Sequence, residues 1–239
     1  IPGLKSNGVY KNLQGSIFPF KYNDLKGLKK ILNKQKEIGI IKMEVMRNIS
    51  PRSNFLKEIR KLATKKKIIL IFDECTSGFR ETFGGIHLKY NVEPDMLILG
   101  KALGNGYAIN AILGKKNIMN KSNQTFISST FWTESSGYAA ALKTLEVMKK
   151  EKSWKYISKI GKYIKSKWLN LAKKHKIKIS IQGISSLPSF NFDKNNMIYK
   201  SFITQEMLKK NILATNTIYV SISHNKMNLK KYFKNLDQV

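Results

Sequence analysis

Residues 95–107 read DMLILGKALGNGY, an apolar run that ends in a glycine and is followed at once by Lys101 and a glycine-containing loop. Such a run predicts a buried β-strand that enters a turn. A second apolar run, IILIF at 68–72, ends in Asp73 and Glu74. Ligands bind at the carboxyl ends of the strands in open α/β sheets. If the two strands are parallel neighbours, we expect Lys101 and Asp73 to meet at that edge.

The spacing of the apolar runs indicates an α/β fold with a mostly parallel sheet. About twenty residues separate 68–72 from 95–100, enough for the crossover that parallel strands require. Only residues 101–107 separate 95–100 from the next apolar run, which favours an antiparallel neighbour. We expect strands at 38–46, 68–72, 95–100 and 108–114, and a helix at 54–67.

The second half of the chain has a different pattern. Residues 154–174 repeat apolar side chains at helical spacing, which predicts a core-facing helix with its lysines in water. A basic amphipathic helix on a membrane surface is the alternative. Helical patterns at 201–210 and 228–236 and a strand pattern at 217–223 follow. We therefore predict two domains, residues 1–154 and residues 155–239.

Composition limits the classes of function. The 239 residues carry a net charge of +29, yet 40 of the 44 basic residues are lysines spread along the chain, whereas arginine is preferred for reading phosphates and bases. We expect no nucleic-acid partner. No apolar run approaches the ~20 residues that span a bilayer, so no membrane association is expected. Cys75 is the only cysteine, which excludes an internal disulfide and favours a reducing, cytoplasmic location.

A lysine and an acid at one sheet edge have a specific chemical use. A partly desolvated lysine amine loses its proton more easily and becomes a nucleophile that forms Schiff bases. Pyridoxal phosphate is a common partner of such a lysine, and its pyridinium nitrogen pairs with a carboxylate. The rival interpretation, the acidic strand of a P-loop ATPase, requires an upstream G-x-x-x-x-G-K-[ST], which this sequence lacks. A nucleotide-binding module and a non-catalytic fragment remain as alternatives of another class.

Three segments resemble one enzyme family over nearly the whole chain. They are FDECTSGFR (72–80), EPDMLILGKALGNGYAINAILG (93–114) and SSTFWTESSGYAAALKTLEVM (128–148). They are similar to class III pyridoxal-phosphate-dependent aminotransferases, most of all to the glutamate-1-semialdehyde aminomutase branch. The resemblance implies the fold-type-I architecture, with residues 1–154 as the later part of the cofactor-binding large domain and residues 155–239 as the small domain. It also implies that the amino-terminal part of the family chain is missing here.

The resemblance implies roles for four residues. Lys101 matches the lysine that holds the cofactor as an internal aldimine, and Asp73 matches the partner of the pyridine nitrogen. Cys75 stands where the family has a valine that packs on the ring face. Thr130 matches the threonine that binds the cofactor phosphate from the neighbouring subunit, so a homodimer is expected.

The implied reaction moves an amino group between an amino donor and a carbonyl acceptor. An intramolecular amino transfer, as in the aminomutase branch, is the alternative. Val45, Asn105 and Ala108 replace a proline, a glycine and a proline of the family pattern around the pocket. Glu44, Glu74 and His224 also fall near the site, with no assigned role. No metal ion is expected.

Overall fold

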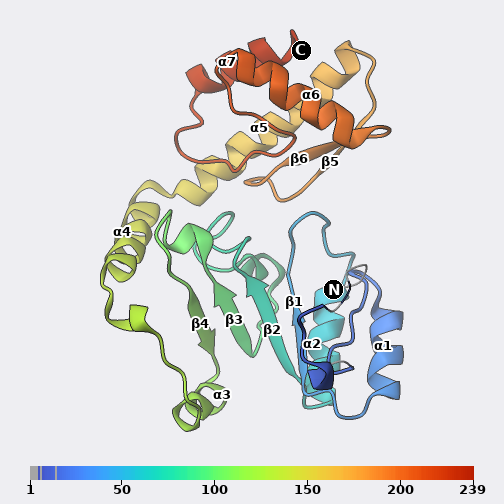
Figure 1. Cartoon of the computed structure of the whole chain (residues 1–239), viewed down its shortest axis with the longest axis vertical. Helices are drawn as coiled ribbons and strands as arrows, with labels where there is room; N and C mark the ends of the chain where they lie inside the picture. Colours follow the sequence, from blue (N-terminus) through green and yellow to red (C-terminus); the bar gives the residue numbers. More distant parts are fainter. Residues whose placement is uncertain (1–4, 6, 14) are drawn as a thin grey trace.

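The computed structural model describes residues 5, 7–13 and 15–239. Its central sheet has the order β1 (Ile40–Met43), β2 (Ile69–Glu74), β3 (Met96–Leu99), β4 (Ala111–Gly114) (Figure 1). The pairs β1–β2 and β2–β3 are parallel, and β3–β4 is antiparallel. The predicted mostly parallel sheet with one antiparallel strand is therefore confirmed.

Helices cover one face of this sheet. Side chains alternate between the faces along β2, so Leu70 and Phe72 are fully buried under α2 (Phe55–Lys65) and α1 (Leu25–Lys34). On the β3 side, Leu99 packs in a smaller cluster that includes residues of α4 (Ser136–Glu151). On the opposite face, Ile40 is 55% exposed and Ile112 is 56% exposed, and Asp73 lies on this open face too.

The carboxyl-terminal third folds around a second core. It contains α5 (Ser153–Lys174), β5 (Ile179–Gln182), β6 (Ser189–Phe192), α6 (Asn196–Lys209) and α7 (Lys226–Leu236). Ile157, Ile164 and Trp168 of α5 are buried in this core, which confirms the core-facing helix predicted at 154–174. Among the helices that the structure describes, none combines the length and the apolar character needed to cross a lipid bilayer.

The remaining elements are short. They are η1 (Lys11–Leu13), η2 (Ile86–Tyr90), η3 (Lys101–Leu103), α3 (Lys116–Met119), η4 (Asn120–Gln124) and η5 (Thr130–Thr133). The largest differences from the expected bounds concern three elements: the strand expected at 38–46 is confined to β1, the strand expected at 108–114 begins at Ala111, and the helix expected at 201–210 begins at Asn196.

The strand predicted at 217–223 is wrong. This segment lies beside residues 186–188, with the Ile218 amide donating to the Pro188 carbonyl and the Val220 amide donating to the Ser186 carbonyl. Only an isolated bridge, Ser189 to Thr217, is formed. Proline has no N–H to donate in return, so Pro188 interrupts the reciprocal ladder that a strand pair needs.

One loop of the second half packs on the first half. Ile184 and Leu187 belong to the core under β1 and β2. The Gly183 amide donates to the Asn48 carbonyl at 3.0 Å, and the buried Glu81 carboxylate accepts from the Ser185 amide. The division into domains at residue 155 stays a prediction.

Candidate active site

Lys101 lies at the carboxyl end of β3, beside the end of β2. The register pairs Leu99 with Glu74, so Lys101 and Thr76 each stand two residues beyond the last pair. The Lys101 Nζ donates to Thr76 Oγ1 at 2.9 Å. The Lys101 backbone has φ 45°, in the left-handed region that is unusual for a residue with a side chain. The strand therefore ends in a sharp change of direction that leaves the amine at the sheet edge.

Asp73 lies on the open face of β2, close to the same edge. Its carboxylate pairs with the Lys42 Nζ at 3.0 Å and accepts from the Cys75 amide at 3.3 Å. Burial raises the pKa of Asp73, but the hydrogen bonds from Lys42 and Cys75 outweigh it, and the net pKa is below the usual value. Asp73 is therefore an ionised carboxylate at neutral pH.

Cys75 follows the end of β2, and its amide donates to the Asp73 carboxylate. Burial raises the pKa of its thiol, the Asp73 carboxylate raises it further, and the Lys101 amine acts in the opposite direction. The net pKa of Cys75 is above its usual value. A Cβ on the neighbouring Gly100 would lie 2.1 Å from Asn110 Oδ1 and 3.2 Å from the Cys75 sulfur. Glycine at position 100 is what allows this close packing.

Glu74, the neighbour of Asp73, points the other way. Its side chain is fully buried, and its two carboxylate oxygens accept from the backbone amides of Ile86 and His87, the Ser77 hydroxyl at 3.2 Å and His87 Nδ1 at 2.7 Å. These partners hold η2 against the end of β2. The role of Glu74 in the structure is therefore to anchor a loop.

Glu44 and His224 are surface or turn residues. The Glu44 carboxylate faces Arg47 at 3.6 Å with both side chains largely exposed. His224 Nδ1 accepts from the Ser221 amide at 3.1 Å, and burial lowers the pKa of His224. These contacts belong to local turns and give neither residue a chemical role.

Thr130 does not join the other three candidate residues in this chain. It begins η5, in the segment between α3 and α4 that runs along the outer side of β4 in Figure 1. Its neighbours Phe126 and Phe131 are 96% and 76% exposed. Its predicted role, to reach a cofactor phosphate in a neighbouring subunit, stays a prediction.

The cluster also contains residues that the sequence did not single out. Lys42 reaches Asp73 because β1 and β2 are parallel and in register, and Thr76 holds the Lys101 amine. The sequence did carry a signal for Lys42: it lies between the apolar residues Ile41 and Met43, and side chains alternate between the two faces of a strand, so Lys42 is expected on the open face. The Thr76 contact depends on the β2–β3 register, which no local pattern reveals. Lys101 is exposed, and the cluster presents its primary amine and the ionised Asp73 carboxylate at the ends of adjacent strands.

Comparisons with known proteins agree with this arrangement. A sequence model described as Aminotransferase class-III matches residues 46–223. A 3-aminobutyryl-CoA aminotransferase of Cloacimonas acidaminovorans is 32% identical over 217 residues, which cover 86% of this chain and 52% of that protein. A glutamate-1-semialdehyde 2,1-aminomutase of Methanosphaera stadtmanae is 31% identical and covers 84% of this chain and 49% of that protein. The chain thus spans about half the length of the curated relatives it matches.

Solved structures share the fold. An omega-transaminase from Sphaerobacter thermophilus superimposes with a TM-score of 0.88 at 16% identity, over 97% of this chain and 58% of that one. An acetylornithine aminotransferase from Elizabethkingia anophelis gives a TM-score of 0.79 at 25% identity, over 92% of this chain and 61% of that one. The family match over residues 46–223, most of the chain, shows that the chain belongs to the class III aminotransferase family.

Proposed function

We propose that this chain belongs to an aminotransferase that uses pyridoxal phosphate to move an amino group from an amino donor to a carbonyl acceptor. In the first half of the reaction the donor loses its amino group and becomes a carbonyl compound. In the second half the acceptor gains that amino group and becomes an amine. The observation that carries the proposal is the placement of Lys101 and Asp73 at the carboxyl ends of two adjacent parallel strands.

The donor set fits pyridoxal phosphate. The primary amine of Lys101 is the group that would hold the cofactor carbonyl carbon covalently. The ionised Asp73 carboxylate is the group that would accept a hydrogen bond from a protonated ring nitrogen. Lys42 pairs with Asp73 in this structure, with side chains that are 56% and 28% exposed. Surface ion pairs of this kind contribute only ~0–1 kcal/mol, so replacing Lys42 by the ring nitrogen as the partner of Asp73 would cost little free energy.

When bound, the cofactor supplies an electron-withdrawing ring that stabilises negative charge on the substrate carbon next to the amino group. Cys75, two residues after Asp73, would offer a soft apolar surface for the ring. Thr76 Oγ1 holds the Lys101 Nζ in place. The Lys101 Nζ would take the proton from the α-carbon of the donor in the first half of the reaction, and in the second half it would deliver a proton to the carbon of the acceptor that becomes the amine carbon.

The test compares Lys101→Ala with Lys116→Ala in the purified protein. Lys116 is an exposed lysine at the start of α3, so it controls for the loss of a positive charge. Amino transfer from a panel of amino donors to a keto acid should fall to background in Lys101→Ala and stay at the wild-type rate in Lys116→Ala. Equal rates in the two variants would refute the assignment of Lys101.

An intramolecular amino transfer is the second candidate function. Its support is the likeness to the Methanosphaera stadtmanae aminomutase named above. The same lysine and acid would serve this reaction, since only the acceptor differs. Conversion of an amino-semialdehyde without any added keto acid would favour the aminomutase, whereas a strict need for a second substrate would favour the aminotransferase.

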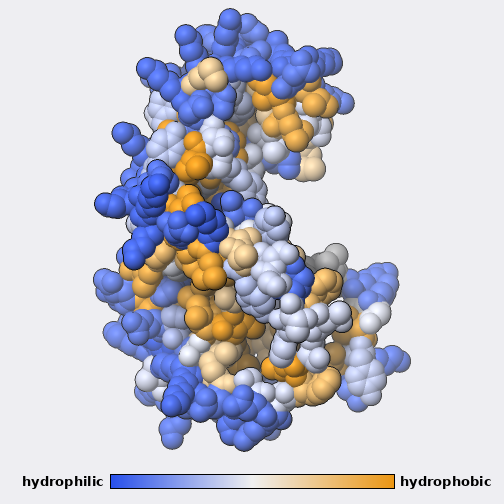
Figure 2. All heavy atoms as spheres, turned by 90° about the vertical axis from the view of Figure 1, so that its left-hand side faces the viewer, coloured by the Kyte–Doolittle hydropathy of each residue, from blue (hydrophilic) through white to orange (hydrophobic). Residues whose placement is uncertain are grey.

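We also propose that the protein is a homodimer in which Thr130 contacts the partner's cofactor phosphate. Support comes from the apolar side chains around it, since Trp132 is 55% and Tyr138 51% exposed. Figure 2 views the molecule from the side on which α4 lies and shows hydrophobic residues gathered there. Exposed apolar patches of this kind mark protein interfaces. Sedimentation should show a dimer that Trp132→Asp weakens, and a wild-type monomer would contradict the proposal.

The free thiol Cys75 supports a cytoplasmic location, which we propose for the protein. Cell fractionation with a tagged full-length gene product should place it with soluble cytoplasmic markers. Recovery from an oxidising compartment would contradict it.

A further inference from the structure

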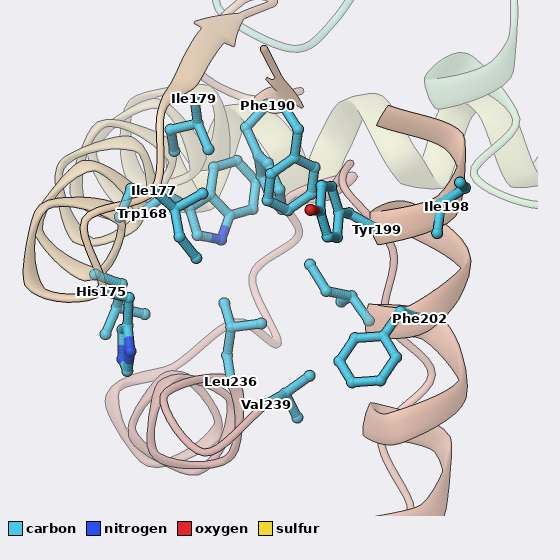
Figure 3. A pocket seen from close by; sticks show the side chains of 14 residues that line it. Trp168, His175, Ile177, Ile179, Phe190, Ile198, Tyr199, Phe202, Leu236 and Val239 are labelled. Carbon is cyan, nitrogen blue, oxygen red and sulfur yellow. The ribbon is translucent and has the colours of Figure 1, made fainter. Parts of the chain in front are cut away.

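Apolar side chains line a hollow in the carboxyl-terminal third, among them Trp168, Phe190 and Phe202 (Figure 3). All of its lining residues fall within 168–239, so it shares no residue with the cluster of Lys101 and Asp73. Among the residues that the structure describes, no lysine, arginine or acid lines it. The charges that bear on the proposed reaction lie in the central sheet instead.

Lys42 is the single cationic residue in the four described strands of that sheet. Those strands contain three charged residues, Lys42, Asp73 and Glu74. Glu74 is fully buried and anchors η2. The open face of the strands therefore presents one cation and one anion. These two are paired, with the Lys42 Nζ 3.0 Å from Asp73 Oδ2.

The sheet itself positions this pair. β1 and β2 are parallel, and the register places Lys42 opposite Ile71, which lies two residues before Asp73 on the same face of β2. The other carboxylate oxygen, Asp73 Oδ1, accepts from the Cys75 amide at 3.3 Å. Both oxygens of the carboxylate therefore have a hydrogen-bond donor from within the chain.

A ring nitrogen that binds Asp73 would share this carboxylate with the Lys42 amine. Both groups are cations when protonated, and like charges close together disfavour each other's charged form. The Lys42 amine can instead leave Asp73 for water, because its side chain is 56% exposed and such pairs contribute little. In either case the bond between the ring and Asp73 is partly offset by the weakening or loss of the Lys42–Asp73 pair.

We propose that Lys42 is a positioning residue that competes with the cofactor ring nitrogen for the Asp73 carboxylate. The cofactor then binds more weakly than Asp73 alone would allow. This inference deepens the proposed function and rests on it, because the ring nitrogen is the competing partner.

Pyridoxine phosphate is the probe that tests the competition. It has the ring nitrogen and the phosphate of the cofactor but an alcohol in place of the aldehyde, so it forms no covalent bond with Lys101. Its dissociation constant is measured by calorimetry in the purified wild type, Lys42→Met and Lys57→Met. Lys57 is exposed on α2, which packs on the opposite face of the sheet, so it controls for the loss of one positive charge.

Lys42→Met should bind the probe about two- to fivefold more tightly, the equivalent of the ~0.4–1 kcal/mol of an exposed ion pair. Lys57→Met should bind it as the wild type does. Unchanged or weaker binding in Lys42→Met would overturn the competition.

Two controls confine the effect to the shared carboxylate. In the Asp73→Asn background, Lys42→Met should no longer change the affinity, because the anion for which the two cations compete is gone. A carbon analogue of the probe, with C–H in place of the ring nitrogen, should bind equally to the wild type and to Lys42→Met. A gain of full size in either control would show that the methionine acts by direct contact with the ring, and would overturn the inference.

The outcomes also separate this inference from the proposed function. A wild type that binds neither pyridoxine phosphate nor pyridoxal phosphate would refute both. A wild type that binds the probe, with the same dissociation constant in Lys42→Met, would refute the competition alone and leave the proposed amino transfer standing.

Discussion

Glu74→Gln tests how the end of β2 is built. The substitution keeps the size of the side chain but replaces one carboxylate oxygen by an NH₂ group. The oxygens of Glu74 accept from the amides of Ile86 and His87, from His87 Nδ1 and from Ser77. With glutamine, one buried donor loses its acceptor at a cost of ~1–3 kcal/mol, and the remaining bonds lose their charge assistance. We expect a loss of about 3 kcal/mol of unfolding free energy.

The assay is thermal and urea unfolding of the variant beside Asp73→Asn. A loss of about 3 kcal/mol corresponds to a fall of roughly 6–12 °C in midpoint temperature for a chain of this size. Asp73 makes only a partly exposed ion pair with Lys42, so Asp73→Asn should cost less than ~1 kcal/mol while it strongly reduces amino transfer. Equal stability losses in these adjacent variants would refute the assignment of Glu74 to a buried anchor and of Asp73 to the open face.

Two further predictions concern the loop that contains Ser185 and Ser186. Gly161→Ala should destabilise the protein by ~2 kcal/mol or more in urea unfolding, because its Cβ would lie only 1.6 Å from the Ser185 carbonyl oxygen, whereas Ala139→Gly, in α4, should cost only about 1 kcal/mol. Burial raises the pKa of Glu81, but hydrogen bonds from Lys89 and from the Ser186 amide outweigh it and lower the net pKa below 4.5. A carboxylate whose pKa is lower in the folded state stabilises the folded state at pH values above its unfolded-state pKa, and this contribution is lost as the pH falls below about 4.5. The urea midpoint of the wild type should therefore fall between about pH 7 and about pH 4, and that of Glu81→Gln should fall less steeply. An unchanged slope in that variant would contradict the second prediction.

The sheet and its edge could be predicted from local patterns. The runs at 68–72 and 95–100 are short, apolar and bounded by charges or glycine, and the seven residues 101–107 that follow the second run are too few for the crossover that a parallel neighbour requires. The same reasoning brought Lys101 and Asp73 together, because both stand at the ends of parallel strands. These inferences need only chain length and strand direction.

Contacts that depend on register or on distant loops were not accessible in this way. Thr76 meets Lys101 only because Glu74 pairs with Leu99, and Glu74 finds its partners in η2, twelve residues further on. The strand expected at 217–223 does not form, because the segment beside it contains Pro188, which has no N–H to donate. The apolar alternation of 217–223 carries no information about that distant proline. Thr130 illustrates a further limit, since its predicted role needs a second subunit.

The most direct test of the account is to locate the covalent attachment of the cofactor. The purified protein is loaded with pyridoxal phosphate, reduced with borohydride to make the amine linkage permanent, digested and mapped by mass spectrometry. We predict one modified peptide, which contains Lys101, and no modification above background in Lys101→Ala. Stoichiometric modification at another of the 40 lysines, or equal labelling of the wild type and Lys101→Ala, would contradict the central claim that Lys101 is the cofactor-binding amine.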